Sequence, residues 1–440
     1  MKKLVIPMIL CAILIPQSAL AVPLVRCDLI PDRGVLSAGQ FEKAVVQISL
    51  NVGHVPPPAD RPPVNLALVL DRSGSMNGSK IEKAKEAAIE ALHRLAPGDL
   101  FSLVVYDHTV QTLVPAQSAA NTEWIEARIR SIRPGGNTAL FGAVSQGAAE
   151  VRRNLHGEYF HRVILLSDGL ANVGPSSPSD LARLGVALLK EGISVTTVGV
   201  GTDFNEDLMT QLAERSDGNH YFVESSRDLP RIFAAELGDV LTVAARSIRI
   251  DIELQEGVRP LRLIGRDGKI RGNHVELYLN QLYGGQEKYA LLEIEVDPTE
   301  AGRIRDLARA RCRYENALSN RPETSESLAQ VRFSASRGDI VKSADKKVQE
   351  ALVENEMAVA REKAVDLVNT GRKDEAVRQL REESAKLKAR SASLGFSDLA
   401  TEADSLDADA EEIAEEGLSA PRKKELKSES YRIRTQQKSY

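Results

Sequence analysis

Val64–Met76 reads VNLALVLDRSGSM, and this stretch decides the fold of the region around it. Leu66–Leu70 is a short uncharged run rich in Leu and Val, which predicts a strand buried on both faces rather than a helix. The run ends at Asp71, and the hydroxyl residues Ser73 and Ser75 follow at alternating positions. A carboxylate and two hydroxyls therefore leave the carboxyl end of a buried strand, which is where open α/β sheets bind ligands.

These side chains are hard oxygen donors, and the stretch contains neither His nor Cys. Hard oxygens with one carboxylate suit Mg²⁺, Mn²⁺ or Ca²⁺ and disfavour Zn²⁺ and Cu²⁺. Mg²⁺ is our first expectation, because it favours octahedral geometry and keeps several waters; Mn²⁺ or Ca²⁺ are possible substitutes.

The pattern Asp-x-Ser-x-Ser after a buried strand resembles the metal-ion-dependent adhesion site (MIDAS) of von Willebrand factor type A (VWA) domains. That family completes the site with a Thr and a second Asp from later loops. Thr138 lies in the sequence GGNTAL, and Asp168 follows the apolar run VILLS, so both have candidates here in the family's order. The resemblance covers about residues 64–242. From the residues alone, Asp71 and Ser73 are also compatible with turn and helix-capping roles.

The resemblance implies a division of roles among the five candidate metal residues Asp71, Ser73, Ser75, Thr138 and Asp168. The three hydroxyls would bind the cation directly, while the two carboxylates would hold its waters or bind it in one state. An Asp or Glu of a partner protein would then fill an open position on the cation. Asp107, after the next strand, is equally compatible with supporting the site and with a turn. Arg72 is expected either at the partner rim or simply exposed to solvent.

Residues 64–244 alternate between apolar runs and segments with helical periodicity. This alternation predicts a doubly wound α/β domain with a mostly parallel sheet covered on both faces. The expected strands are 65–70, 100–106, 109–115, 161–166, 194–200 and 220–223. The expected helices are 81–95, 122–132, 139–153, 178–191, 206–215 and 228–244.

Residues 245–338 change to short alternating segments separated by turn residues, which predicts a β-sandwich. The expected strands are 247–254, 261–264, 273–279, 288–296, 308–315 and 329–334. Residues 22–63 contain a further alternating segment, Phe41–Leu50, and then a stiff linker with five prolines at His54–Pro63. We expect this strand to join the sandwich, so that the α/β domain is inserted into a discontinuous β domain. Two separate β elements are the alternative.

Cysteine usage bears on the same question. Cys27 precedes the α/β domain and Cys312 follows it. In an oxidising compartment two such thiols favour one disulfide, and two buried free thiols are the alternative.

Residues 339–440 have helical periodicity, interrupted at Gly371. The helix–Gly–helix pattern is similar to a tetratricopeptide-like unit, and a bundled or coiled helical tail is equally compatible with it. The acidic block 398–416 and the basic block 422–440 either pair with each other or, as we expect, form solvated faces.

Residues 1–21 have a basic start at Lys2 and Lys3, an apolar run and the sequence Ala-Leu-Ala, which predicts a secretory signal peptide. An uncleaved anchor is the alternative. No later stretch is apolar enough to span a bilayer, so we expect an exported protein of the periplasm or cell surface. The net charge is −5 and aromatic residues make up 4%, which argues against nucleic acid as a partner.

An enzyme is not expected. A hydrolase with Ser73 as nucleophile needs a positioned base, and His108 is the histidine near this edge of the sheet. An aspartyl-phosphate site needs an Asp two residues after Asp71, where Ser73 stands. The sequence therefore favours an exported, divalent-cation-dependent protein-binding module for adhesion or complex assembly. The alternative is a structural envelope protein in which the metal only stabilises the loops.

Overall fold

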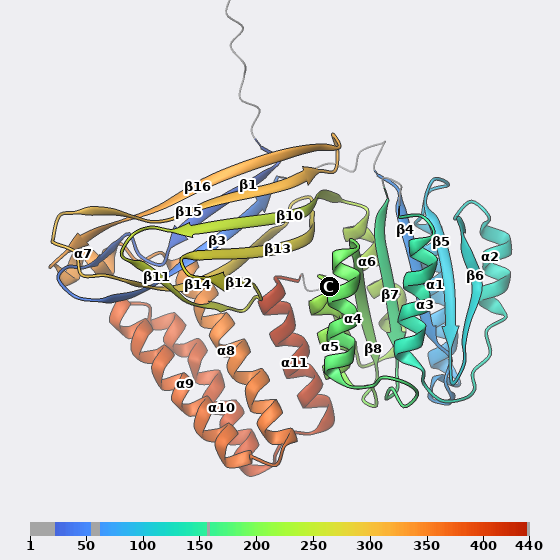
Figure 1. Cartoon of the computed structure of the whole chain (residues 1–440). Helices are drawn as coiled ribbons and strands as arrows, with labels where there is room; N and C mark the ends of the chain where they lie inside the picture. The colour runs from blue at the N-terminus through green and yellow to red at the C-terminus, as the bar shows by residue number, and fades with distance from the viewer. Residues whose placement is uncertain (1–22, 54–61, 156–158, 438–440) are drawn as a thin grey trace, which may run out of the picture.

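The computed structural model describes residues 23–53, 62–155 and 159–437. The predicted signal peptide and residues 54–61 of the proline-rich linker lie outside the described residues. The chain forms three parts: a β-sandwich, an α/β domain beside it and a helical bundle below the sandwich (Figure 1). The α/β, β and helical regions predicted from the sequence are therefore all present.

The α/β domain is built on a six-stranded sheet with the order β6-β5-β4-β7-β8-β9, in which only β6 is antiparallel to its neighbour. Its strands are β4 (Val64–Asp71), β5 (Leu100–Tyr106), β6 (Val110–Ser118), β7 (Phe160–Ser167), β8 (Ile193–Val200) and β9 (His220–Val223). Its helices are α1 (Ser79–His93), α2 (Thr122–Arg130), α3 (Leu140–Arg152), α4 (Pro178–Lys190), α5 (Glu206–Arg215) and α6 (Leu229–Val240).

Strand β4 is buried along its whole length, and its side chains alternate between two cores. Leu66, Leu68 and Leu70 pack with α1, α2 and α6 on one face of the sheet. Ala67 and Val69 pack with α3, α4 and α5 on the other face. The run of apolar residues without polar alternation is therefore what a strand covered on both sides requires.

One predicted boundary in this domain is wrong. The helix expected over 228–244 ends at Val240, because the chain enters β10 (Val243–Leu254) three residues later. Val243, Ala244 and Ala245 are buried, and β10 pairs with β13 from Val243 onward. Helical periodicity continued past the end of the helix because the first residues of the strand are also small and apolar.

The sandwich consists of a four-stranded sheet, β1-β3-β14-β11, and a six-stranded sheet, β12-β13-β10-β15-β16-β2. The strands before the α/β domain are β1 (Val25–Pro31), β2 (Val35–Ser37) and β3 (Glu42–Val52). Those after it, with β10, are β11 (Val258–Ile264), β12 (Lys269–Arg271), β13 (His274–Tyr283), β14 (Glu287–Val296), β15 (Ile304–Asn316) and β16 (Arg321–Ser334).

The α/β domain is inserted into this sandwich, as the sequence predicted. Strand β3 pairs with β14 over ten residues, so segments on either side of the insertion share one sheet. Strand β2 joins β16 in the other sheet. The β domain therefore cannot be completed until the chain has passed through the whole α/β domain.

The predicted disulfide is not formed, since Cys27 and Cys312 are both free and buried. Cys27 lies on β1 and Cys312 on β15, in opposite sheets, and both belong to the sandwich core. The Cys27 side chain, which hydrogen-bonds Cys312, and burial both raise the pKa of the Cys312 thiol. The expected proximity is therefore present, and the two sulfurs interact as neutral thiols in an apolar core.

The helical tail is a bundle of α8 (Lys346–Asn369), α9 (Lys373–Leu394), α10 (Ser397–Glu415) and α11 (Ala420–Thr435), preceded by the short α7 (Arg337–Lys342). Apolar side chains of α8, α9 and α10 form its core. Ala351 and Leu352 of α8 also pack on Val45, Ile264 and Leu291 of the four-stranded sheet. The bundle thus covers the outer face of that sheet.

The basic block at the end of the chain is not a solvated face. Arg422 pairs with Asp409 and Glu412 of α10, which is the alternative weighed from the sequence. The basic residues that follow contact α5 instead, so that α11 lies between the bundle and the α/β domain (Figure 1). These ion pairs are Lys424 with Glu206, Lys427 with Asp207 and Arg434 with Glu214.

The amino ends of the parallel strands are fixed to the sandwich. Phe160, the first residue of β7, packs against Val243 and Tyr283. Arg162, with no exposed surface, donates to Thr196 in the α/β sheet and to Gln281 and Tyr283 of β13. Its Nη1 also lies 3.6 Å from Oε1 of the buried Glu236. Since the amino ends face the sandwich, the carboxyl ends of the strands point away from it.

We predict that Arg162→Ala lowers the free energy of unfolding by about 3–5 kcal/mol, because it leaves the Glu236 carboxylate buried without its cation. The measurement is urea unfolding followed by far-UV circular dichroism. The control is Arg152→Ala, which removes an exposed pair with Glu191 and should cost at most about 1 kcal/mol. Equal losses in the two variants would mean that neutral hydrogen bonds alone satisfy Glu236.

Candidate metal centre

The five predicted site residues meet at the carboxyl edge of the parallel sheet. Asp71 is the last residue of β4, and Asp168 follows β7 directly. Ser73 precedes the 3₁₀ turn Gly74–Met76, which contains Ser75, and Thr138 lies in the loop before α3. The open cavity between these loops has a volume of about 300 Å³, and its lining includes Ser73, Ser75 and Thr138. Strands β4 and β7 are neighbours, so their ends bring the two carboxylates together.

Asp71 is fully buried and held on both oxygens. Its Oδ1 accepts a hydrogen bond of 2.8 Å from the backbone N–H of Ser73. Its Oδ2 accepts one of 2.8 Å from the hydroxyl of Ser167, the last residue of β7. These two bonds fix the loop after β4 to the end of the neighbouring strand.

The hydroxyls form a chain that ends on Asp168. Ser75 Oγ donates to Asp168 Oδ1 over 2.6 Å, and Ser73 Oγ lies 3.0 Å from Ser75 Oγ. The other Asp168 oxygen, Oδ2, lies 2.5 Å from the ammonium of Lys80 in the first turn of α1. Asp168 has no exposed surface, so its charge is compensated entirely within this group.

Backbone hydrogen bonds lock the Thr138 loop to the other two loops. Gly74 N–H donates to the carbonyl of Gly136 over 3.0 Å, and Gly135 N–H donates to the carbonyl of Arg72 over 2.7 Å. Thr138 N–H donates to Asn172 Oδ1 over 2.9 Å. The three loops that supply the oxygens are therefore one connected unit.

Two glycines give these loops their close approach. Gly136 has φ +78°, and a Cβ there would lie 2.3 Å from His108 Nδ1, so only glycine fits. A Cβ added to Gly169 would point between two hydroxyls, 3.4 Å from Thr138 Oγ1 and 3.5 Å from Ser75 Oγ. The open space beside Gly169 is thus bordered by the oxygens that would hold a cation.

The donor set fits a hard cation such as Mg²⁺, Mn²⁺ or Ca²⁺. It combines three hydroxyl oxygens with two carboxylates from different strand ends. Among the residues that the structure describes, no group of three or more His, Cys, Asp or Glu side chains could hold a metal. A metal at this place therefore depends on the hydroxyls of Ser73, Ser75 and Thr138.

The two carboxylates at the ends of β4 and β5 have opposite pKa shifts. Burial raises the pKa of Asp71 to about 6, although hydrogen bonds from Ser73 and Ser167 oppose the shift. Burial alone would raise the pKa of Asp107 as well, but hydrogen bonds from Thr109 and the Arg72 guanidinium hold it below its usual value. Asp71 is therefore the carboxylate that still lacks a compensating cation.

The neighbours considered from the sequence have defined roles. Arg72 Nε pairs with Asp107 Oδ2 at 3.0 Å, so its side chain is partly buried in an ion pair rather than simply exposed to solvent. Asp107 accepts from the N–H and hydroxyl of Thr109, which gives it the turn role, and its carbonyl accepts from Ala139 N–H beside Thr138. His108 directs Nδ1 toward Asp107 Oδ1 at 3.3 Å.

Sequence reasoning missed three residues of the site: Ser167, Asn172 and Lys80. Ser167 stands directly before Asp168, and a hydroxyl at the end of a buried strand was a signal available in the sequence. Asn172 follows on the same loop. Lys80 gave no such signal, because only the geometry of the α1 amino end directs its ammonium at Asp168.

The rim of the cavity is also fixed from the helical bundle. Asp203, in the loop between β8 and α5, lines the cavity. The next residue, Phe204, accepts a hydrogen bond from Lys424 of α11 through its carbonyl, and the ammonium lies 4.3 Å from the centre of its ring. Helix α11 therefore holds one of the loops that border the site.

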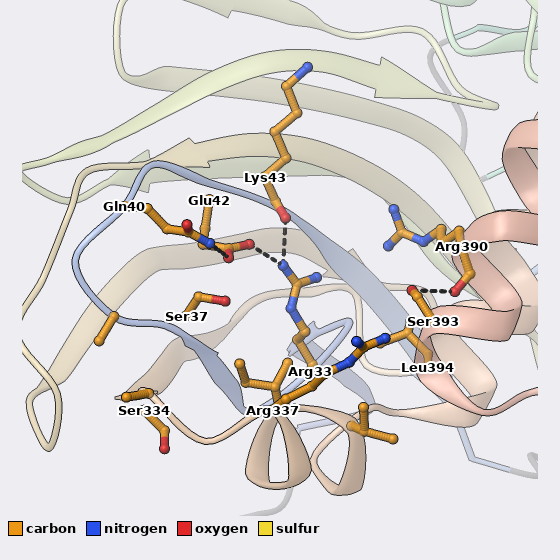
Figure 2. Close-up of a pocket in the computed structure, with 14 residues that line it drawn as sticks. Arg33, Ser37, Gln40, Glu42, Lys43, Ser334, Arg337, Arg390, Ser393 and Leu394 are labelled. Carbon is orange, nitrogen blue, oxygen red and sulfur yellow. Dashed lines mark hydrogen bonds and ion pairs between the residues drawn. The ribbon is translucent and has the colours of Figure 1, made fainter.

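A second cavity, of about 600 Å³, lies where the sandwich meets α7 and α9 (Figure 2). Arg33 and Arg390 line it, and both bind the buried carboxylate of Asp32. Arg33 also donates to Glu42 and to the carbonyl of Lys43 (Figure 2). These buried charges pair with one another, so the cavity marks a joint between two parts of the chain.

The sequence model of the von Willebrand factor type A domain family matches residues 65–235 of this chain. The chain is 25% identical over 269 residues to an uncharacterized protein of Synechocystis, covering 59% of this chain and 63% of that one. It is 28% identical over 201 residues to the inter-alpha-trypsin inhibitor heavy chain H1 of Sus scrofa, covering 43% of this chain and 22% of that one. The chain thus spans less than two thirds of these relatives.

Solved structures share the fold over most of the chain. A von Willebrand factor type A protein from Catenulispora acidiphila has a TM-score of 0.72 at 16% identity, covering 93% of this chain and 96% of that one. The ArnB paralog VWA2 from Sulfolobus acidocaldarius has a TM-score of 0.61 at 17% identity, covering 94% and 99%. The α/β unit inserted in the sandwich of this chain is a von Willebrand factor type A domain.

Proposed function

We propose that this protein is a divalent-cation-dependent protein-binding module and that its metal site is formed by Asp71, Ser73, Ser75, Thr138 and Asp168. The observation that supports this proposal most is the convergence of the Ser73, Ser75 and Thr138 hydroxyls on one open cavity of about 300 Å³, with the carboxylates of Asp71 and Asp168 buried beside them. The cavity lies at the edge of the sheet that points away from the sandwich. A partner can therefore reach it without displacing another part of the chain.

The residues of the site have separate roles in this proposal. Ser73, Ser75 and Thr138 offer hydroxyl oxygens to the cation, and Mg²⁺ is our first choice, with Mn²⁺ or Ca²⁺ as substitutes. Asp71, fixed by Ser73 N–H and the Ser167 hydroxyl, places a negative charge beside these oxygens. Asp168 orients the hydroxyl of Ser75 by accepting its proton. A bound cation would supply an electropositive open position for a carboxylate oxygen of a partner's Asp or Glu.

Binding rather than catalysis is the activity that we propose. Ser73 Oγ hydrogen-bonds Ser75 Oγ, which in turn bonds the carboxylate of Asp168. His108, the base considered for a hydrolase, directs Nδ1 at Asp107. Ser73 is thus engaged with a hydroxyl, whereas an activated serine nucleophile is engaged with a base.

Export to the periplasm or cell surface is part of the proposal and rests on the signal-peptide pattern of residues 1–21. A role in adhesion or in assembly of an envelope complex follows from that location. Within the described residues, no helix combines the length and apolarity needed to cross a membrane.

A structural protein in which the metal only stabilises the loops is the second candidate. It is favoured by the hydrogen bonds that already join the three loops, since a cation there would reinforce an existing connection. The two candidates differ in whether any partner depends on the metal.

The first prediction concerns the metal itself. Isothermal titration of Mg²⁺ into the chain from Val22, after treatment with EDTA, should give one site in the wild type. Asp71→Ala should abolish binding, and Thr138→Ala should weaken it about 10-fold or more. Asp228→Ala is the control, because Asp228 is exposed, pairs with Arg231 and does not belong to the candidate site. This variant should bind Mg²⁺ as the wild type does. If both site variants still give the wild-type heat of Mg²⁺ binding, this set of ligands is excluded.

The second prediction separates a binding module from a scaffold. Immobilised wild-type protein should retain a partner with an accessible Asp or Glu in Mg²⁺ and release it in EDTA. Thr138→Ala should retain little of it, while Asp228→Ala should behave as the wild type does. If Mg²⁺ raises the Tm of the protein but no retained protein depends on Mg²⁺, the structural alternative is the correct one.

The third prediction follows from the pKa of Asp71, which burial raises from 3.8 to about 6. Between about pH 4 and pH 6, Asp71 binds more protons in the folded chain than in the unfolded chain. Its contribution to the free energy of unfolding therefore falls as the pH rises. In EDTA, Asp71→Asn should therefore exceed the wild type in unfolding free energy by about 3 kcal/mol at pH 8. The two proteins should converge below about pH 4.

Asp107→Asn is the matched control, because the pKa of Asp107 is lowered and its ionised form stabilises the fold. This variant should be less stable than the wild type at pH 8, opposite in sign to Asp71→Asn. Chemical denaturation at several pH values measures both differences. A loss of stability in Asp71→Asn at pH 8 would show that the hydrogen bonds of the ionised carboxylate outweigh its burial.

A further inference from the structure

Lys80 is a cation built into the candidate metal centre. It lies in the first turn of α1, four residues after Met76, and its Nζ is 2.5 Å from Asp168 Oδ2. The Asp168 side chain has no exposed surface, whereas that of Lys80 is 27% exposed. The ammonium thus reaches inward from the rim and neutralises one of the two carboxylates of the site.

The loop after β8 lies close to this ammonium. Gly201 has φ +73°, and a Cβ added there would lie 3.6 Å from Lys80 Nζ. The ammonium therefore lies between Asp168, at the end of β7, and the loop that follows β8. Strands β7 and β8 are neighbours in the sheet, so Lys80 lies beside the ends of two strands.

Lys80 and Ser75 occupy different oxygens of Asp168. Asp168 accepts on Oδ1 from Ser75 and on Oδ2 from Lys80, so both of its oxygens are occupied. Ser75 gives its one proton to this carboxylate, so its oxygen can act only as an acceptor in the 3.0 Å contact with the Ser73 hydroxyl. Each hydroxyl keeps a lone pair that no protein group uses in this chain of hydrogen bonds. Both serines line the cavity, so these lone pairs are available to a cation there.

We propose that Lys80 is a positioning residue that keeps Asp168 in the role of a hydrogen-bond acceptor and lowers the affinity of the site for its cation. This inference rests on the proposed function. With Lys80 in place, the cation faces one uncompensated carboxylate, Asp71, and neutral hydroxyls. It therefore retains more of its positive charge for the carboxylate of an acidic partner.

Removal of the ammonium changes both the free and the loaded protein. Without Lys80, Asp168 is a buried carboxylate with no cation, so the metal-free protein loses stability. The freed oxygen then offers a full negative charge to the metal, which raises affinity. A merely structural role for Lys80 would instead predict weaker metal binding, because damage to the loops would misplace the ligands.

The experiment titrates Mg²⁺ by calorimetry into the EDTA-treated chain from Val22 in four forms: wild type, Lys80→Met, Lys80→Arg and Lys83→Met. Lys83 lies on the same helix and pairs with the exposed Glu86, so Lys83→Met is the matched control. Lys80→Met should lower the Kd for Mg²⁺ about 10-fold or more. Lys80→Arg, which keeps the charge, and Lys83→Met should stay within about threefold of the wild type.

The Tm in EDTA is the second readout, and it does not depend on metal. Lys80→Met should have a lower Tm than the wild type and should gain more from Mg²⁺, while Lys83→Met should change neither value. Binding by the wild type with equal or weaker binding by folded Lys80→Met overturns the role of Lys80 alone. Absence of Mg²⁺ binding in all four proteins overturns the proposed metal function, and the Lys80 inference falls with it.

Discussion

The burial of β4 on both faces is the constraint on which the rest of the structure depends. A strand covered by helices on each side carries its last residue, Asp71, into the interior with no exposed surface. An ionised carboxylate there needs compensation. The chain supplies two hydrogen bonds to it, from Ser73 and Ser167, but those groups are neutral. The remaining deficit of positive charge is the physical reason why this edge of the sheet is suited to a cation.

The buried negative charges of the two carboxylates are compensated differently. Asp168 has a lysine as its counter-charge within the protein, and Asp71 has none. Similar residues at the ends of neighbouring strands therefore have different electrostatic roles. Ser75 donates to Asp168, and the hydroxyl residues Ser73, Ser75 and Thr138 line the cavity.

The sandwich and the helical bundle contact the body of the α/β domain rather than the five candidate metal residues. The sandwich contacts the amino ends of the strands through the hydrogen bonds of Arg162, and the bundle contacts α5 through ion pairs of basic residues on α11. Gln437 extends this contact, since its side-chain amide both donates to and accepts from the backbone of His220 on the edge strand β9. The carboxyl edge of the sheet, which holds the candidate metal centre, faces away from the sandwich. Contacts with the sandwich and with the bundle thus restrain the α/β domain that carries this edge.

The sequence by itself predicted the local elements and, through its resemblance to von Willebrand factor type A domains, the five candidate site residues. Uninterrupted apolar runs predicted the buried strands, and the order of Asp71, Thr138 and Asp168 placed the candidate ligands at their ends. The insertion of the α/β domain was also predictable, because the six strands expected after it called for one more, which Phe41–Leu50 could supply. These features follow from periodicity and from polar residues at strand ends, which short-range patterns record.

Only the tertiary structure decided which charges meet. Lys424 and Lys427 look like part of a solvated basic block, yet their side chains are only 5% and 7% exposed because α11 folds back onto α5. Lys80 looks like any helix-surface lysine until the end of β7 brings Asp168 to it. Cys27 and Cys312 approach across two sheets, as expected, but remain thiols. Ion pairs and sulfur contacts depend on distances between segments remote in sequence, and a linear pattern does not contain those distances.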